Sequence, residues 1–531
     1  MSLPYHILKV CGGVVFAARA GSIYSFNSDL EYISAWEYPV KQQQQTKGQE
    51  ASATEQQKES SAADGPPTKR RKVESSQEAA PSNGSGDAEG AGAPETKPKK
   101  KGKSYTTPTD RAFVQGLYST TDGRHLVAIT GSDKTIRVFE HDGAGNLRLL
   151  SERQMPKRPC DIAITPDNRT ILSADKFGDV YGLPLIESED GQWSKETSAA
   201  QQKSRSATPA ASQAYKPQAN EFTVHTVRNR KALENQKLVL EQRAKEEKAE
   251  GPQFEHILLL GHVSMLTAIA VGTSPKNNKP YIITADRDEH IRITRSIPQT
   301  HVIEGFCLGH DEFISTICIP PLRPDLLISG GGDDELYVWN WVSNQRLSKT
   351  DLLKEAQKLA PEMAKLAVTR IFATRPKQIN KKGDENNKSD DHTLVFVICE
   401  RIPAIFCFQL KDSETTLQHA QTIPLPNGNN PLDVEYLHSS PSPRLLVAVD
   451  PNSITTSSTE NTTEPAATTT TPSLRVFSLE QGQWHPTEQV IKGPEPSTGS
   501  SPEESNPITV QELQKILYTT ESLRKTATDF E

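Results

Sequence analysis

Short apolar runs separated by polar turns recur along most of the chain. Runs such as Val14-Val15-Phe16-Ala17 and Leu126-Val127-Ala128-Ile129 have the length and the apolar, β-branched content of buried strands. Between such runs lie turns rich in Gly, Asp and Ser, for example Gly131-Ser132-Asp133-Lys134. The pattern therefore predicts an all-β protein made of many short antiparallel strands.

Two stretches between residues 260 and 341 follow one order of elements. Each has a Gly-His pair, an apolar strand, a turn with Asp and a second strand; the positions are Gly261-His262, 281–285, Asp288 and 291–293 in the first stretch, and Gly309-His310, 326–330, Asp333 and 336–340 in the second. This order resembles the WD40 repeat, whose four strands form one blade of a β-propeller. Because a lone blade leaves both faces unburied, we expect neighbouring blades that close into a ring.

Weaker repeats bring the expected number of blades to seven. They are expected near residues 5–40, 109–153, 157–186, 254–300, 304–348, 365–422 and 430–490. The expected fold class is an all-β, seven-bladed WD40 β-propeller with long disordered insertions. We expect the N-terminal strand to pair into the last blade, because that closure leaves no exposed sheet edge.

Composition separates the blades from the segments between them. The expected organisation is a first blade (1–40), a disordered low-complexity insertion with basic clusters (41–108), blades 2 and 3 (109–186), a charged insertion (187–253), blades 4 to 7 (254–491) with a Thr/Ser-rich loop (451–472), and a C-terminal tail with a short helix (492–531). The insertions are rich in polar residues and poor in aromatics, so they bury too little apolar area to offset chain entropy.

Several function classes find no support in the residues. No apolar run is long enough to span a membrane, and no Cys-x-x-Cys pair indicates a metal site. The run Gly330-Gly331-Gly332 joins two strands and is not followed by a helix, so it does not predict a phosphate-binding loop. We expect neither a cofactor, nor a metal, nor catalytic residues, and hence no enzyme.

The His and Asp residues of the repeats have a structural explanation. In such repeats the His, the turn Asp and a Ser or Thr form a buried hydrogen-bond network, and buried polar groups of this kind must be satisfied. We expect this role for His262, His310, Asp133 and Asp333.

Two basic clusters lie in the first insertion. They are Lys69-Arg70-Arg71-Lys72 and Lys99-Lys100-Lys101. Exposed basic runs of this length are typical of nuclear import signals or of non-specific contacts with nucleic acid, and a further alternative is a solubilising loop. Since two clusters share one segment, we expect a nuclear protein.

The first strong repeat and its flanks resemble a more specific family. Residues 261–267, 281–292 and 303–310 are similar to the WD-repeat, non-catalytic subunit of the fungal tRNA (guanine-N7-)-methyltransferase, and the other blades match weakly. The resemblance implies that the propeller forms a heterodimer with a separate catalytic subunit. It also implies that the propeller holds this subunit in its active form. That pair forms N7-methylguanosine in the tRNA variable loop, and tRNA is reached through the complex.

The resemblance also implies where the partner binds. It assigns the contact to Asp288, Glu289 and Arg292, in a turn that carries more charge than a structural turn needs. We expect a rigid ring to present Arg292 and the nearby acids at its rim, where they meet complementary charges.

Two other functions remain open at this point. The first is a nuclear WD40 adaptor for a ubiquitin ligase or for chromatin, without a role in RNA; Trp339-Asn340-Trp341-Val342 lacks the Trp-Asp-x-Arg ending that ligase adaptors often carry. The second is an independent RNA-binding propeller, although no dense basic and aromatic face is evident. The fold alone does not choose among them.

Overall fold

The chain is described here by a computed structural model. It describes residues 3–39, 112–188, 191–206, 254–376, 392–411, 413–438, 443–451, 472–489, 491, 493 and 509–525. The two basic clusters and most of the predicted insertions lie outside these residues.

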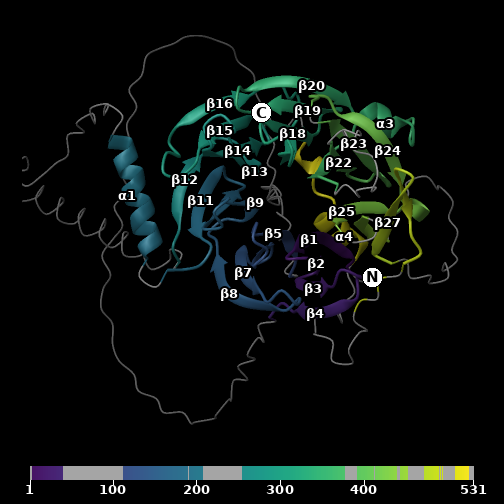
Figure 1. Cartoon of the computed structure of the whole chain (residues 1–531), viewed down its shortest axis with the longest axis horizontal. Coiled ribbons are helices and arrows are strands. Elements are labelled where there is room, and N and C mark those ends of the chain that lie inside the picture. Colours follow the sequence, from purple (N-terminus) through teal and green to yellow (C-terminus); the bar gives the residue numbers. More distant parts are fainter. Residues whose placement is uncertain are drawn as a thin grey trace, which may run out of the picture. The chain divides into compact units, whose positions relative to one another are not determined.

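In the described part of the chain there are seven four-stranded antiparallel sheets, and each consists of four strands that are consecutive in the chain. They stand radially in a ring, which confirms the predicted seven-bladed β-propeller (Figure 1). Blades 1 to 4 contain β1 (Tyr5–Cys11), β2 (Val14–Arg19), β3 (Ser22–Phe26), β4 (Tyr32–Trp36); β5 (Val114–Ser119), β6 (His125–Thr130), β7 (Thr135–His141), β8 (Leu147–Gln154); β9 (Pro159–Ile164), β10 (Thr170–Asp175), β11 (Asp179–Pro184), β12 (Ile257–Gly261); and β13 (Leu266–Thr273), β14 (Pro280–Asp286), β15 (Ile291–Arg295), β16 (Ile303–Cys307). Blades 5 to 7 contain β17 (Ile314–Cys318), β18 (Leu326–Gly331), β19 (Glu335–Asn340), β20 (Gln345–Asp351); β21 (Val368–Thr374), β22 (His392–Cys399), β23 (Ala404–Lys411), β24 (Gln418–Pro424); and β25 (Asn430–Leu437), β26 (Arg444–Asp450), β27 (Leu474–Glu480), β28 (Gln483–Pro486).

Burial explains why some strands were easier to predict than others. The second strands, such as β10 and β18, are buried at every position because neighbouring blades cover both faces. They therefore appear in the sequence as continuous apolar runs. Outer strands such as β20 are largely exposed and carry mainly polar residues, so their pattern is weak.

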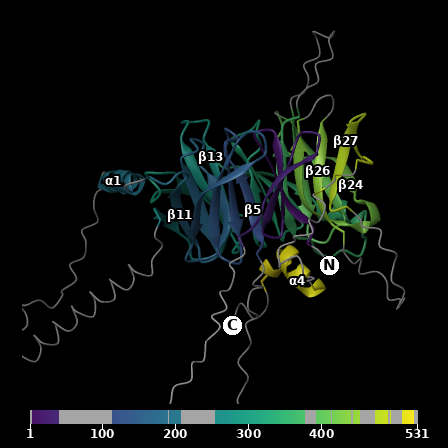
Figure 2. The same cartoon turned by 90° about the horizontal axis from the view of Figure 1, so that it is seen from below.

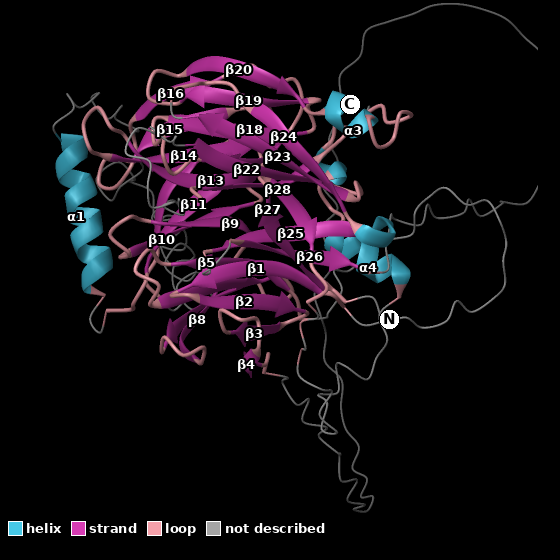
Figure 3. Ribbon diagram, turned by 45° about the vertical axis from the view of Figure 1, so that its right-hand side comes forward, coloured by secondary structure: helices cyan, strands magenta, loops and turns pink. Residues whose placement is uncertain are grey.

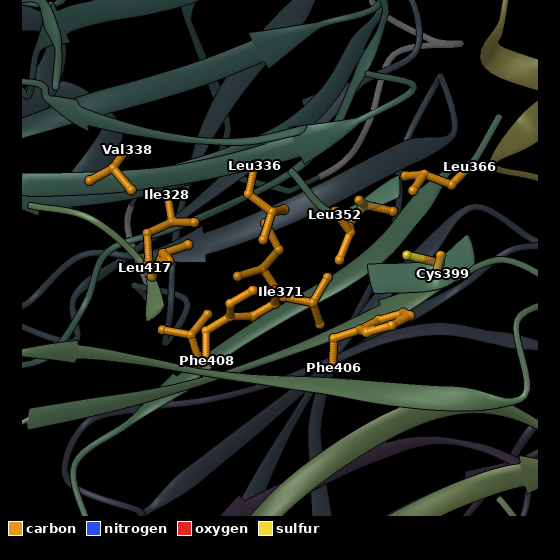
Figure 4. Packing of buried hydrophobic residues seen from close by; sticks show 14 of the residues in the cluster. Ile328, Leu336, Val338, Leu352, Leu366, Ile371, Cys399, Phe406, Phe408 and Leu417 are labelled. Atoms are coloured by element: carbon orange, nitrogen blue, oxygen red, sulfur yellow. The ribbon is translucent and has the colours of Figure 1, made fainter. Parts of the chain in front are cut away.

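The core lies between the blades rather than at the centre of the ring. Between blades 5 and 6, for example, Ile328 and Val338 face Ile371, Phe406 and Phe408 (Figure 4). All of these side chains are at most 4% exposed. Since each blade buries one face against each neighbour, the ring is held together by a repeated apolar contact.

The ring closes differently from the prediction. We expected the N-terminal strand to pair into the last blade, but β1 pairs with β2 and the last blade is completed by β28. Blades 1 and 7 meet face to face instead, and the amide of Leu8 donates to Asp433 Oδ2 at 2.8 Å. Tyr5, Leu8 and Leu446 belong to one buried cluster across this junction. The prediction of a shared blade was therefore wrong, because apolar packing supplies the closure that strand exchange would give.

The third blade extends beyond its predicted end. Strand β12 pairs with β11, so the segment 187–253 interrupts blade 3 instead of separating it from blade 4. The prediction started blade 4 at residue 254, before the pair Gly261-His262. In the structure Gly261 ends the outer strand β12 of blade 3, and His262 lies between it and the inner strand β13 of blade 4, which moves the boundary to residue 261.

The helices lie outside the sheets (Figures 2 and 3). Those in the described residues are α1 (Gln192–Ser206), α3 (Leu353–Gln357), α4 (Val510–Leu517), and the 3-10 turns η1 (Pro426–Gly428) and η2 (Glu521–Leu523). Helix α1 begins the predicted charged insertion, and its Gln201 Nε2 lies 3.4 Å from Thr300 Oγ1. Among the described helices, none has the length and apolarity to cross a membrane.

Helix α4 agrees with the short helix predicted in the C-terminal tail. A capping box begins it: Thr509 Oγ1 accepts from the amide of Glu512, whose side chain accepts from the amide of Thr509. Leu513 is only 2% exposed and packs on Leu3, so the helix lies against one flat face of the ring (Figure 2).

Candidate partner-binding site

Blade 5 contains a buried network of the kind predicted for the repeats. His310 Nδ1 lies 2.7 Å from Asp333 Oδ2, and its Nε2 lies 2.7 Å from Ser329 Oγ. Trp339 Nε1 also donates to Ser329 Oγ, at 2.8 Å. Burial raises the pKa of Asp333, but the hydrogen bond from His310 and other contacts outweigh it, so the net pKa is lowered. The network fixes the connection between β16 and β17 to the turn between β18 and β19.

Ser329, His310 and Asp333 are connected in the same order as the Ser, His and Asp of a serine-protease triad. Burial argues against that chemistry, because Ser329 is 0% and His310 5% exposed, whereas a nucleophile must be open to its substrate. The hydroxyl is also engaged by the indole of Trp339. The arrangement therefore acts as a structural clasp.

In blades 2 and 4, other residues form the hydrogen bonds that His310, Asp333 and Ser329 form in blade 5. Asp133 accepts from Arg137 Nη2 at 2.7 Å and from Tyr38 OH at 2.9 Å, without a His. In blade 4, His262 Nε2 lies 3.0 Å from Thr284 Oγ1. Burial, together with nearby Arg292 and His290, lowers the pKa of His262 to about 4. The imidazole is therefore neutral at neutral pH.

The charged turn of blade 4 joins β14 to β15. Asp286, which the sequence analysis did not single out, is 4% exposed and accepts from the amide of His290 at 3.0 Å. Asp288 was aligned with the turn Asp of the repeats, but its side chain is 48% exposed. Asp286 thus holds the turn from within, whereas Asp288 accepts a hydrogen bond from Ser264 and keeps a largely exposed carboxylate.

Glu289 follows Asp288 at the tip of the same turn. Its φ of 71° lies in the left-handed region, where a residue with a Cβ is less stable than glycine. Its side chain is 32% exposed. Two carboxylates therefore project side by side from the turn, and they form the acidic turn (Asp288 and Glu289) referred to below.

The acidic turn contacts a residue from the far end of the chain. Lys525 Nζ lies 2.6 Å from Glu289 Oε1 and 3.1 Å from Asp288 Oδ1. Burial raises the pKa of Asp288, but hydrogen bonds from Ser264 and Lys525 outweigh it and the net pKa is lowered. Nothing in the sequence pattern indicated this contact, since 236 positions separate Lys525 from Glu289.

Arg292 does not join this surface. It is 9% exposed, and its Nη1 donates to the carbonyl of Gly261 at 2.9 Å while its Nε donates to Thr294 Oγ1 at 3.0 Å. The expected display of Arg292 at the rim is not seen in the free chain, because the guanidinium links β15 to the end of β12. Its contact with a partner stays a prediction. Of the three residues that the resemblance assigned to partner contact, Asp288 and Glu289 are accessible.

The sequence also raised basic clusters, metal ligands and cysteines as possible sites. Both basic clusters, Lys69 to Lys72 and Lys99 to Lys101, lie outside the described residues. Within the part of the chain that the structure describes, no group of His, Cys, Asp or Glu side chains could hold a metal ion. The six cysteines are free thiols.

Comparison with known proteins identifies the family. A family model described as the tRNA methyltransferase TRM82 WD40 domain matches residues 15–477. The chain belongs to this family. A TRM82 relative from Sclerotinia sclerotiorum, named tRNA (guanine-N(7)-)-methyltransferase non-catalytic subunit, is 39% identical over 536 residues, or 98% of each chain. Relatives of the same name from Phaeosphaeria nodorum and Aspergillus clavatus are 40% and 37% identical, and cover 66% and 76% of this chain and 71% and 76% of their own.

These findings decide two predictions. The resemblance to the WD-repeat subunit is confirmed, and it extends over nearly the whole chain rather than over one strong repeat. The names of the TRM82 relatives call them non-catalytic subunits, which confirms that a member of this family is not itself the enzyme. Family membership also favours the tRNA hypothesis over the ubiquitin-ligase or chromatin adaptor.

Proposed function

We propose that this chain is the non-catalytic subunit that binds and stabilises the catalytic subunit of a tRNA (guanine-N7-)-methyltransferase. In this proposal the two chains form a heterodimer, and the heterodimer forms N7-methylguanosine in the tRNA variable loop. Similarity to named non-catalytic subunits over 98% of the chain is the observation that carries the proposal. Binding would favour the active arrangement of the partner through differential affinity for its conformations.

The acidic turn is the proposed contact. Asp288 and Glu289 stand together at the end of a buried, four-stranded blade, so the ring holds both carboxylates in place. A rigid pair of negative charges selects a basic segment on the partner, and partly desolvated charge pairs at interfaces couple by about 1.5–7 kcal/mol. Arg292 then supports the site indirectly, by holding β15 from within.

The test is co-purification with the catalytic subunit of the same organism, followed by measurement of N7-methylguanosine in tRNA. Reversing both charges (Asp288→Lys with Glu289→Lys) should weaken the complex at least tenfold. A loss of about 1.4 kcal/mol of coupling energy is enough for a tenfold change in Kd. The matched control is Asp29→Lys with Glu31→Lys, which reverses two exposed acids in the turn between β3 and β4. If both pairs of substitutions weaken the complex equally, the acidic turn is not the contact.

A second variant separates binding from stability. Glu289→Gly removes the carboxylate and places the residue that best tolerates a φ of 71° at this position. We expect the free energy of unfolding to stay within about 1 kcal/mol of wild type while partner binding falls. Unchanged binding by this variant would leave Glu289 without the proposed role.

A further inference from the structure

The last described residues of the chain form a strap across one face of the ring. After α4, Tyr518 OH donates to Asp450 Oδ2 at 2.6 Å, in blade 7. The amide of Thr520 donates to Glu400 Oε2 at 2.6 Å, in blade 6. Arg287 Nε donates to the carbonyl of Leu523 at 2.7 Å, in blade 4. The strap (residues 518–525) is therefore attached to three blades by directed hydrogen bonds before its last two residues are reached.

Arg524 enters an acidic cavity on blade 5. Its Nη1 lies 2.9 Å from Glu312 Oε1 and donates to the carbonyl of Gly332 at 3.1 Å, and its Nη2 donates to the carbonyl of Leu366 at 3.0 Å. The guanidinium carbon lies 5.5 Å from the centre of the Phe313 ring. The cavity has a volume of about 540 Å³, and its carboxylates include Asp334, Glu335 and Asp351. Arg524 is 13% exposed there, so the site takes a guanidinium at depth.

Lys525 makes the adjacent contact with the acidic turn. Its ammonium lies between the two carboxylates, 2.6 Å from Glu289 Oε1 and 3.1 Å from Asp288 Oδ1. The hydrogen bond to Glu289 raises the pKa of Lys525, so the ammonium keeps its charge. Blades 4 and 5 thus share one acidic surface that takes two consecutive basic side chains, one in the cavity and one on the turn.

Lys525 already lies against both carboxylates, so a basic side chain of a partner that takes the same position competes with the strap. We propose that Arg524 and Lys525 are an intramolecular ligand of this acidic surface, and that a basic segment of the catalytic subunit must displace them in order to bind. The inference rests on the proposed function above. A tethered ligand competes at a high effective concentration even when each of its ion pairs is weak.

The competition has a measurable consequence for affinity. If the strap is closed in about nine molecules of ten, the apparent affinity for the partner is reduced by roughly tenfold, because the open fraction alone is able to bind. Arg524→Ala with Lys525→Ala in the full chain should therefore tighten the complex several-fold and increase its association rate. The control is Lys515→Ala, which removes an exposed lysine from α4 and should change nothing.

Two measurements decide the outcome. Titration of the catalytic subunit with wild type, the double variant and the control gives the three dissociation constants. Hydrogen exchange of the free subunit reports whether the amides of residues 286–290 lose protection in the double variant, as we expect. Tighter binding together with faster exchange supports the proposal.

Other outcomes overturn it. Equal or weaker binding by the double variant means that the strap does not compete, and weaker binding means that it contributes to the interface. If neither wild type nor the double variant binds the catalytic subunit, the proposed function fails and the competition with it. Exchange in the free subunit then still shows whether Arg524 and Lys525 cover the acidic turn.

Discussion

Arg137 and Arg292 occupy similar positions in their repeats but bind different groups. Each follows the Asp of its turn by four residues, and each is at most 9% exposed. Arg137 forms ion pairs with Asp133 and Glu152 and lies 4.9 Å from the Tyr38 ring. Arg292 instead binds a backbone carbonyl and a hydroxyl, since Asp288 points to solvent. Sequence position alone does not distinguish the two.

The burial of Arg292 changes what its substitution should do. Arg292→Glu places a carboxylate against the carbonyl of Gly261, so we expect the free energy of unfolding to fall by about 2–3 kcal/mol. Urea denaturation followed by tryptophan fluorescence measures this. Lys276→Glu makes the same change of charge at an exposed turn of the same blade and should have little effect. A fully stable Arg292→Glu variant that fails to bind the partner would return Arg292 to the contact surface.

At the scale of elements, two junctions between blades contain the same hydrogen bond, from a backbone amide to the carboxylate of an Asp on the neighbouring blade. The amide of Ile269 on β13 donates to Asp161 Oδ2 on β9, and the amide of Leu8 on β1 donates to Asp433 Oδ2 on β25, both at 2.8 Å. The junction that closes the ring therefore uses the same bond as an ordinary junction between blades 3 and 4. This explains why no strand needs to be exchanged between the first and last blades.

The junction between blades 1 and 2 contains a buried histidine and is expected to respond to pH. His6 Nε2 lies 2.8 Å from the carbonyl of Val114, and burial lowers the pKa of His6 from 6.5 to about 4. As the pH falls, the unfolded chain binds a proton at His6 before the folded chain does. The contribution of His6 to the free energy of unfolding is therefore fully present above about pH 6.5 and is lost as the pH drops towards 4. This one group should contribute about 3 kcal/mol over that range.

Urea midpoints between pH 7 and pH 4 measure this loss. His6→Gln keeps a donor for the carbonyl of Val114 but has no titrating group, so its midpoints should depend less on pH. An identical slope in wild type and variant would assign the pH dependence to other groups.

At the scale of the whole molecule, the ring and the basic clusters are expected to have separate tasks. The blades hold the acidic turn and the strap, while Lys69 to Lys72 and Lys99 to Lys101 lie outside the described residues. Nuclear import through these clusters stays a prediction.

Replacing the seven basic residues with alanine tests this separation. We expect nuclear accumulation of a fluorescent fusion to be lost, while the thermal unfolding temperature and co-purification with the catalytic subunit are unchanged. Replacing Lys276 and Lys279, two exposed lysines in a turn of blade 4, with alanine provides a control for loss of positive charge. Continued nuclear accumulation of the first variant would contradict the assignment.

Local patterns in the sequence were sufficient for the blades, their number and the family. Apolar periodicity, turn residues and the pair Gly309-His310 all act over a few positions, so they are visible without the fold. The outer strand β12 was assigned to blade 4 because it follows a long insertion and is a short run in which only Leu259 and Leu260 are buried. Its assignment depends on pairing with β11, which is a contact between distant segments.

The functional surface depends on contacts of that distant kind. Charge in the turn of blade 4 was evident from Asp288 and Glu289, but burial of Arg292 follows from the approach of Gly261, and the occupation of the turn follows from the path of Lys525. Periodicity reports which face of a strand is apolar, and it carries no information about which remote side chain arrives there. The sequence pattern alone thus predicted a ring with an acidic turn. Only the tertiary structure decided which charged side chains reach solvent and which pair with residues distant in the sequence.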